Sequence, residues 1–181
     1  ISRGDWSSDV CSSDLLRKAI PNQSINEIKY YKIKLYSNIP IGKFSLINTA
    51  QYQKKDQAVE TGELSAINVP EWITRNTVMY SSKLFNRSLD IQTGVTFNYF
   101  TKFWANYYNP LISEFVVQNY IEIGEFPRFD FFFNAKIQQT RVFIKVEHLN
   151  SSFSGYDYYS DPFTPYRDLS VRFGLVWNFF Q

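Results

Sequence analysis

The sequence predicts an all-β chain, an antiparallel up-and-down transmembrane β-barrel that is incomplete, with about seven strands of a larger barrel. Three observations predict this class. Apolar and polar residues alternate with a period of two along several long segments, as in strands. Aromatic residues make up 19% of the chain while mean hydropathy is −0.30, which suits strands that face lipid on one side and water on the other. No apolar run approaches the ~18 residues of a spanning helix.

The predicted strands follow one another along the chain. Three weaker alternating segments come first and four clearer ones follow. Their expected lengths, about 9–14 residues, exceed the ~5–6 residues of ordinary strands and suit the ~9–11 residues of tilted membrane strands. The seven segments are residues 28–36, 44–52, 72–84, 89–99, 128–137, 141–147 and 169–180.

The predicted connections alternate between short and long. Tight turns are expected at 38–42, where Pro40 and Gly42 are turn formers, and at 85–87 and 138–139. Long connections are expected at 54–70, 102–127 and 150–168. Outer-membrane barrels show this alternation, with tight periplasmic turns and long outer loops, and it places the C-terminus in the periplasm. Residues 112–121 therefore belong to an outer loop, with room for a short strand above the membrane.

A soluble antiparallel β-sandwich also alternates, so alternation alone leaves that class open. Long strands, aromatic residues near strand ends and an aromatic final strand favour the barrel. Bacterial barrels have an even number of strands, at least eight, and an open edge in lipid leaves backbone groups without partners. We therefore expect the earlier strands of the barrel to be missing from this sequence.

The first residues match a translated DNA adaptor rather than a segment of a natural protein. The stretch DWSSDVCSSDL, which ends at Leu15, is what a common short-read sequencing adaptor encodes, and every residue of it matches. It holds the only cysteine, Cys11, which has no partner for a disulfide. The sequence therefore predicts an artefactual, disordered segment at 1–15, an irregular lead-in at 16–26 and the C-terminal part of a barrel at 27–181.

Charged residues of the alternating segments predict the water-facing wall. Basic residues outnumber acidic ones there, which suggests a positive potential that a low-dielectric tube would focus on anions. Alternatively the charges pair across neighbouring strands, as with Lys145 and Glu147 near Arg141. The candidate lumen-lining residues are Lys32, Lys34, Lys43, Arg75, Lys83, Asp90, Asp130, Lys136, Arg141, Lys145, Glu147 and Arg172.

The sequence offers no set of residues for catalysis or metal binding. The only histidine, His148, has no second histidine or cysteine with which to share a metal, so a structural polar group near the membrane rim is the expectation. There is no phosphate-binding glycine loop and no nucleophile elbow. We expect no enzyme activity, no cofactor, no metal and no nucleic-acid partner.

The final segment, VRFGLVWNFFQ, resembles the C-terminal assembly signal of outer-membrane β-barrels. That signal has a polar residue, a glycine two positions on, and then aromatic residues spaced by two. The usual signal stops at the last aromatic residue, whereas two more residues follow here. The positions that fill the pattern are Arg172, Gly174, Trp177 and Phe179.

Longer stretches resemble the C-terminal part of the putative porin family of Bacteroidota. They are PEWITRNTVMYSSKLF (70–85), LDIQTGVTFNYFTKFWANYYNP (89–110) and the segment 126–180, which begins FPRFDFFFNAK. The likeness covers roughly residue 25 to the end. FFFNAKIQQTRVFIKVEHLN also resembles the closing hairpin of TonB-dependent receptors.

The resemblance implies an outer-membrane channel of a Gram-negative bacterium. Its function would be the passive diffusion of small hydrophilic solutes, and its partners would be outer-membrane lipid and the barrel-assembly machinery. Two alternatives stay open. The segment could be the barrel end of a TonB-dependent active transporter, or a non-transporting surface or soluble β-protein.

Overall fold

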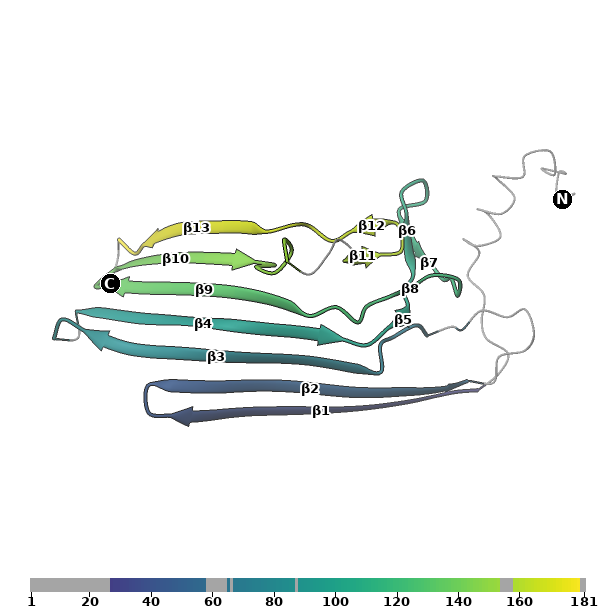
Figure 1. Ribbon diagram of the computed structural model, residues 1–181, viewed down its shortest axis with the longest axis horizontal. Helices are drawn as coiled ribbons and strands as arrows, with labels where there is room; N and C mark the ends of the chain where they lie inside the picture. The colour runs from purple at the N-terminus through teal and green to yellow at the C-terminus, as the bar shows by residue number, and fades with distance from the viewer. Residues whose placement is uncertain (1–26, 58–64, 66, 87, 154–157, 180–181) are drawn as a thin grey trace, which may run out of the picture.

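Seven strands of the chain form one antiparallel sheet in a computed structural model, which describes residues 27–57, 65, 67–86, 88–153 and 158–179 (Figure 1). Each strand pairs with the next long strand along the chain, in the order β1-β2-β3-β4-β9-β10-β13. The sheet is open, with β1 and β13 at its edges, so the fold class is the predicted incomplete, up-and-down β-structure. The strands are β1 (Ile28–Ile41), β2 (Phe44–Gln57), β3 (Trp72–Leu84), β4 (Leu89–Phe100), β9 (Arg128–Ile137), β10 (Thr140–Glu147) and β13 (Ser170–Trp177).

All seven predicted strands are present. β3 has the predicted bounds, while β1 and β2 reach 14 residues each and extend beyond their predicted ends. β10 has 8 residues and begins one residue before its predicted segment, whereas β13, also of 8 residues, is shorter than the predicted 169–180. The described residues include no helix long and apolar enough to cross a membrane. The predicted artefact at 1–15 and the lead-in at 16–26 lie outside the described residues.

The first turn differs from the prediction. Pro40 does not begin a turn but continues β1 opposite Ser45, and the turn consists of Gly42 and Lys43. Proline is tolerated here because β1 is an edge strand of the sheet. Gly42 has a φ of 63°, a left-handed conformation that glycine adopts without steric cost. Lys43, predicted to line the lumen, therefore lies in the turn rather than in a strand.

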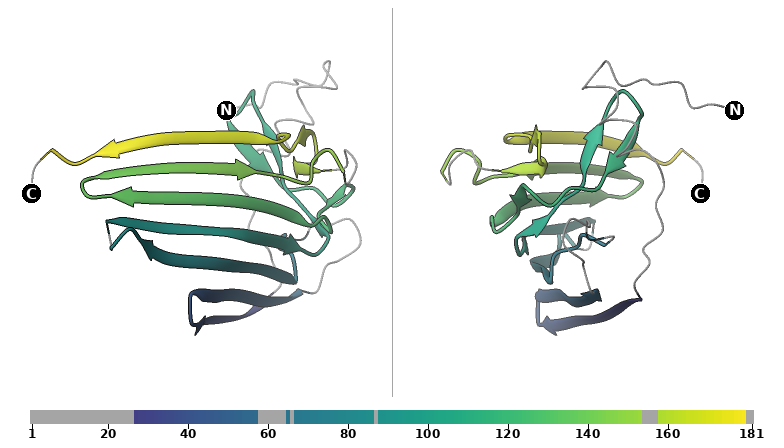
Figure 2. Two further views of the ribbon diagram at one scale, coloured as in Figure 1. Left: turned by 60° about the vertical axis from the view of Figure 1, so that its left-hand side comes forward. Right: turned by 90° about the vertical axis from the view of Figure 1, so that its right-hand side faces the viewer.

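The other short turns lie where they were predicted. Phe85 and Asn86 between β3 and β4, and Gln138 between β9 and β10, have φ values of 50–52°. The three short turns lie at one end of the sheet and the three long connections at the other, which we call the tight-turn end and the long-loop end (Figures 1 and 2). The predicted alternation of short and long connections is therefore present.

The register divides the sheet into two faces. Direct cross-strand partners share a face; for example, Asp90 lies opposite both Lys83 and Lys136. We call this side the polar face. It consists of the even-numbered residues of β1, β4, β9 and β13 and the odd-numbered residues of β2, β3 and β10. The remaining strand residues form the apolar face.

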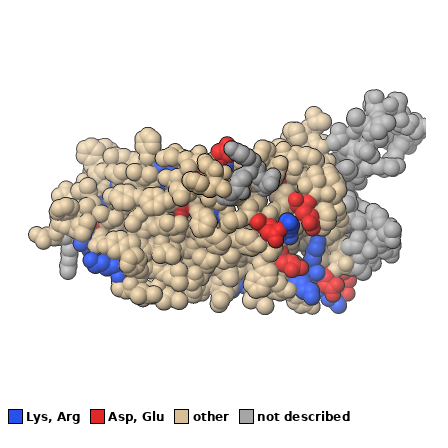
Figure 3. All heavy atoms as spheres, in the orientation of Figure 1, with Lys and Arg blue, Asp and Glu red and all other residues tan. Residues whose placement is uncertain are grey.

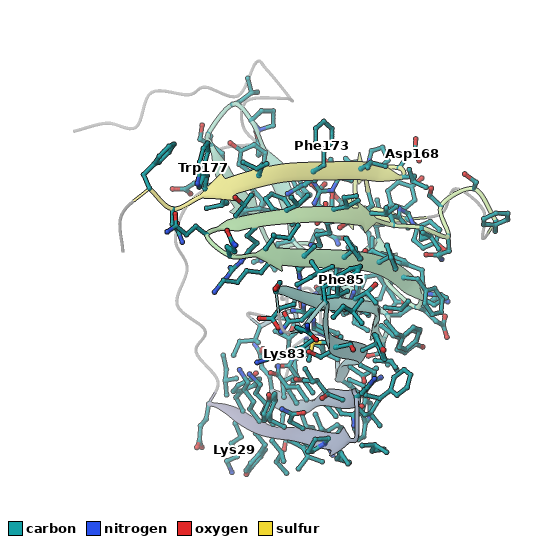
Figure 4. All side chains as sticks on the ribbon, turned by 90° about the vertical axis from the view of Figure 1, so that its left-hand side faces the viewer. Lys29, Lys83, Phe85, Asp168, Phe173 and Trp177 are labelled. Atoms are coloured by element: carbon teal, nitrogen blue, oxygen red, sulfur yellow. The ribbon has the colours of Figure 1, made fainter. Side chains whose placement is uncertain are left out.

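The apolar face carries large side chains that no second layer of the described chain covers. Phe173 is 81% exposed and points away from the other strands at the β13 edge (Figure 4). The charged strand residues on this face, Lys29, Lys54 and Asp56, all lie at the long-loop end. The side shown in Figure 3 accordingly bears few charges along the strands and a cluster of them near the long connections. Other exposed members of this face are Ile33, Leu35, Ile41, Phe44, Trp72, Val78, Val95, Ile137, Val171, Leu175 and Trp177.

A small apolar core lies among the long connections instead. The fully buried apolar side chains of the described residues are all found there: Ala105, Val116, Ile123, Phe126 and Tyr158. Short strand pairs organise these connections. They are β5 (Phe103–Trp104) with β8 (Glu122–Ile123), β6 (Tyr107–Asn109) with β7 (Glu114–Val116), and β11 (Tyr159–Asp161) with β12 (Thr164–Pro165).

Candidate functional site: the polar face of the sheet

The structure places every predicted lumen-lining residue on the polar face except Lys43. Lys32 and Lys34 lie on the edge strand β1, opposite Gln53 and Gln51. The others fall into three groups: one near the tight-turn end, one around Glu147 near the long-loop end, and one around Asp130. The three groups differ in how far their charges are paired.

The first group is a row of four charged residues across four strands at the tight-turn end. Lys83 of β3 lies opposite Asp90 of β4, Asp90 opposite Lys136 of β9, and Lys136 opposite Arg141 of β10. Within the described part of the chain, none of the three basic residues forms an ion pair, and Asp90 Oδ1 is buried without a hydrogen-bond partner. One carboxylate therefore stands among three cations.

The second group is centred on Glu147, whose side chain is only 10% exposed. Lys145 Nζ lies 2.6 Å from Glu147 Oε1, and Arg172 Nη2 lies 3.1 Å from Oε2. Arg167, from the connection before β13, adds a third cation at 3.3 Å. The charge pairing that the sequence left open is thus present within β10 for Lys145 and across β10 and β13 for Arg172, but not for Arg141. The contribution of Arg167 was not predicted, because it lies outside the alternating segments.

The third group is centred on Asp130 in β9. Asn98 Nδ2 donates a hydrogen bond of 3.1 Å to Asp130 Oδ2, and the backbone N–H of His148 donates one of 2.9 Å to Oδ1. Arg128 Nε lies 3.9 Å from Oδ1. Asp130 thus connects β4, β9 and the residue that follows β10. These contacts fix its position on the polar face from three sides.

His148 occupies a structural position next to this group. Its side chain is 1% exposed, and its Nδ1 lies 2.8 Å from the backbone oxygen of Arg167. The ring packs edge-on against Tyr158 and Tyr166, with centroids 4.4 and 5.5 Å away. Among the described residues, no three histidine, cysteine or acidic side chains gather to hold a metal ion.

The polar face is hollowed at its centre. A cavity of about 440 Å³ is lined by side chains from six strands, β1 to β4, β9 and β10. Hydroxyl groups and charges face it together: Thr77 and Thr96 share a hydrogen bond of 3.0 Å, and Arg75, Asp130 and Lys145 border it. Such a lining can replace part of the hydration of a small polar solute.

A second hollow of about 410 Å³ lies toward the long-loop end. Trp104, Glu122 and Gln53 are among its lining residues. Lys102 and Glu125 border it as an ion pair of 2.6 Å, and this contact raises the pKa of Lys102. Both hollows use residues of β2, and the second is also lined by Glu71 and Thr101, which flank β3 and β4 at the long-loop end.

The residues of the predicted assembly signal divide between the two faces. Arg172 and Gly174 lie on the polar face, and Trp177 lies on the apolar face. The ring of Phe179 stacks on Trp177 with a centroid distance of 4.7 Å. Gly174 also serves packing, which the sequence pattern did not reveal, because the ring of Phe143 covers it from the neighbouring strand.

Comparison with known proteins agrees with this arrangement. A family model described as "Putative porin" matches residues 15–181, which include all seven strands of the sheet. No curated protein and no solved structure matches the chain.

Proposed function

Because the chain belongs to the putative porin family, we propose that it forms part of the wall of an outer-membrane channel through which small hydrophilic solutes diffuse passively. The family implies a location in the outer membrane and a channel rather than an enzyme. The observation that supports the proposal best is the contrast between the two faces of a single-layered sheet. One face is apolar and uncovered, and the other is polar and hollowed.

The apolar face suits lipid better than water. Apolar surface left in water costs about 25 cal/mol per Å², and residues such as Phe173 and Leu35 are more than half exposed. A soluble sandwich would cover such a face with a second sheet. Hydrocarbon removes the same cost, provided that the backbone groups of the sheet edges find partners in a closed barrel.

The polar face suits a water-filled lumen. Its central hollow presents hydroxyl, guanidinium, ammonium and carboxylate groups, which exchange hydrogen bonds with hydrated solutes. Several of these groups are fixed in place, since Asp130 is bonded to Asn98 and to the backbone of His148. A fixed, polar wall supports diffusion without a conformational cycle.

The short and long connections support one orientation in the membrane. The tight turns would face the periplasm and the long connections the exterior, so the C-terminus would be periplasmic. The barrel-assembly machinery would recognise the last strand through Arg172, Gly174, Trp177 and Phe179. A tag at the C-terminus of the full-length protein should therefore stay protected from protease in intact cells and become accessible once the outer membrane is opened.

Liposome swelling with the purified full-length protein tests the channel. Uptake of sugars should fall with increasing solute size and need no energy source. Vesicles that stay impermeable would refute the channel. Uptake that requires an energised inner membrane would indicate the TonB-dependent alternative, and a protein that stays soluble without detergent would indicate a soluble β-protein.

A further inference from the structure

We propose that the tight-turn end of the wall makes this channel prefer anions, through a basic collar formed by Lys83, Lys136 and Arg141 on the polar face and Lys43 in the adjoining turn. The inference rests on the proposed function and deepens it, because it names the class of solute: small carboxylates, phosphates and inorganic anions. It also assigns part of that preference to one end of the lumen.

The four basic residues of the collar lie at the same end of the sheet. Lys83, Lys136 and Arg141 share the polar face and belong to one cross-strand row. Lys43 lies in the turn beside that row, where its backbone oxygen accepts a hydrogen bond of 2.8 Å from Ser81 of β3. Figure 4, viewed from this end, shows Lys83 near the middle of the stack of strands.

The collar carries an excess of positive charge. Asp90 is its one carboxylate, and none of the four basic residues has an ion-pair partner among the described residues. Toward the long-loop end, by contrast, Glu147 lies within 3.3 Å of Lys145, Arg167 and Arg172. Near the long loops, three cations therefore share one carboxylate, whereas the cations of the collar form no ion pair; Lys32, Lys34 and Arg75 on the polar face also have no ion-pair partner among the described residues.

Unpaired cations in a narrow, water-filled tube attract anions strongly. The low dielectric constant of the wall and the surrounding lipid focuses the field along the lumen. Screening acts over about 8 Å at physiological ionic strength, so neighbouring members of a cross-strand row act together. Around Glu147, one carboxylate offsets only one of the three cations that share it, so that group adds to the field as well.

Reversal potentials of the full-length protein in a planar bilayer, under a potassium chloride gradient, test the collar. The unmodified channel should give a reversal potential whose sign indicates a preference for chloride over potassium. The double variant Lys83→Gln and Lys136→Gln should shift the reversal potential toward zero, and Asp90→Asn should shift it further toward anion preference. The matched control is Lys29→Gln and Lys54→Gln, which removes the same charge from the apolar face and should leave the potential unchanged.

The outcomes separate this inference from the proposed function. A channel that conducts without preference, or that prefers cations, would overturn the collar and leave the passive channel standing. An equal shift in the control variant would also overturn it, because the position of the charge would then not matter. Absence of conductance would overturn both. Heat-modifiable migration in gels shows that each variant is folded before its potential is compared.

Discussion

The ring of Phe143 covers Gly174 on the polar face. The two residues are direct partners across β10 and β13, and a Cβ atom added to Gly174 would lie 2.5 Å from Phe143 Cζ. Phe132 covers Gly94 in the same way, with its Cζ 2.8 Å from the added atom. Because glycine has no side chain, each aromatic ring can pack directly on the backbone of the neighbouring strand. Such packing is a known means of stabilising glycine in sheets.

Substitution of Gly174 by valine should force the Phe143 ring away from the strand. We expect the free energy of unfolding to fall by about 1–3 kcal/mol, as for other overpacked sites. The loss should shrink in a Phe143→Ala background, where the space is free. Denaturant unfolding of the full-length protein in lipid vesicles measures both backgrounds, and an equal loss in the two would contradict the packing argument.

Phe173 provides a test of the lipid-facing side. Phe173→Lys should lower the free energy of unfolding in vesicles by about 2–4 kcal/mol, because an ammonium group near the middle of a membrane strand loses its hydration. Val176→Lys, on the same strand but on the polar face and also exposed, is the matched control and should cost much less. Similar costs for the two variants would show that the faces are assigned wrongly.

His148 should stabilise the connection between β10 and β13. His148→Ala removes a ring that is almost wholly buried between Tyr158 and Tyr166 and should cost about 2 kcal/mol. Hydrogen exchange should rise in residues 148–153 and 158–169 while the strands stay protected. Phe153→Ala is the control, because Phe153 is 88% exposed and should have little effect. Unchanged exchange in the His148 variant would refute the role.

Glu147 should matter more than an exposed acidic residue. Glu147→Gln leaves Lys145, Arg167 and Arg172 without their shared carboxylate, and we expect a loss of about 1 kcal/mol that is smaller at high salt. Glu125→Gln breaks an ion pair with Lys102 in which both side chains are more than half exposed, and its effect should be close to zero. Thermal unfolding at two salt concentrations compares the variants. If both variants lose the same free energy of unfolding, the cluster around Glu147 stabilises the protein no more than the exposed ion pair does.

Much of the sheet could be predicted because its side chains repeat with a period of two. Alternation placed Lys83 and Asp90 on one face and Phe173 on the other, and it located each of the seven strands. The first turn was misplaced because Pro40 and Gly42 both favour turns, and only the pairing of Pro40 with Ser45 shows that the strand continues. Turn-forming residues therefore locate a hairpin more reliably than they locate its last strand residue.

The contacts between segments could not be predicted from the same pattern. Arg167 reaches Glu147 from an irregular connection, and the cover of Phe143 over Gly174 depends on the register between two strands. The pairs β5–β8 and β6–β7 have only two or three residues per strand, too few to show a period. Side chains such as Gln118, which bonds the backbone of Ala105 and Ile121, hold these connections together instead.

The small core among the long connections gives the chain two parts that depend on different solvents. Phe126 and Tyr158 are buried there against other side chains of the connections, so water itself drives that part to fold. The strands have no such core among the described residues. Their favourable free energy of folding comes instead from moving apolar side chains from water into hydrocarbon. Urea should therefore loosen the long connections at concentrations that leave the strands of the sheet intact. A change of lipid thickness should instead affect the strands and leave the long connections intact.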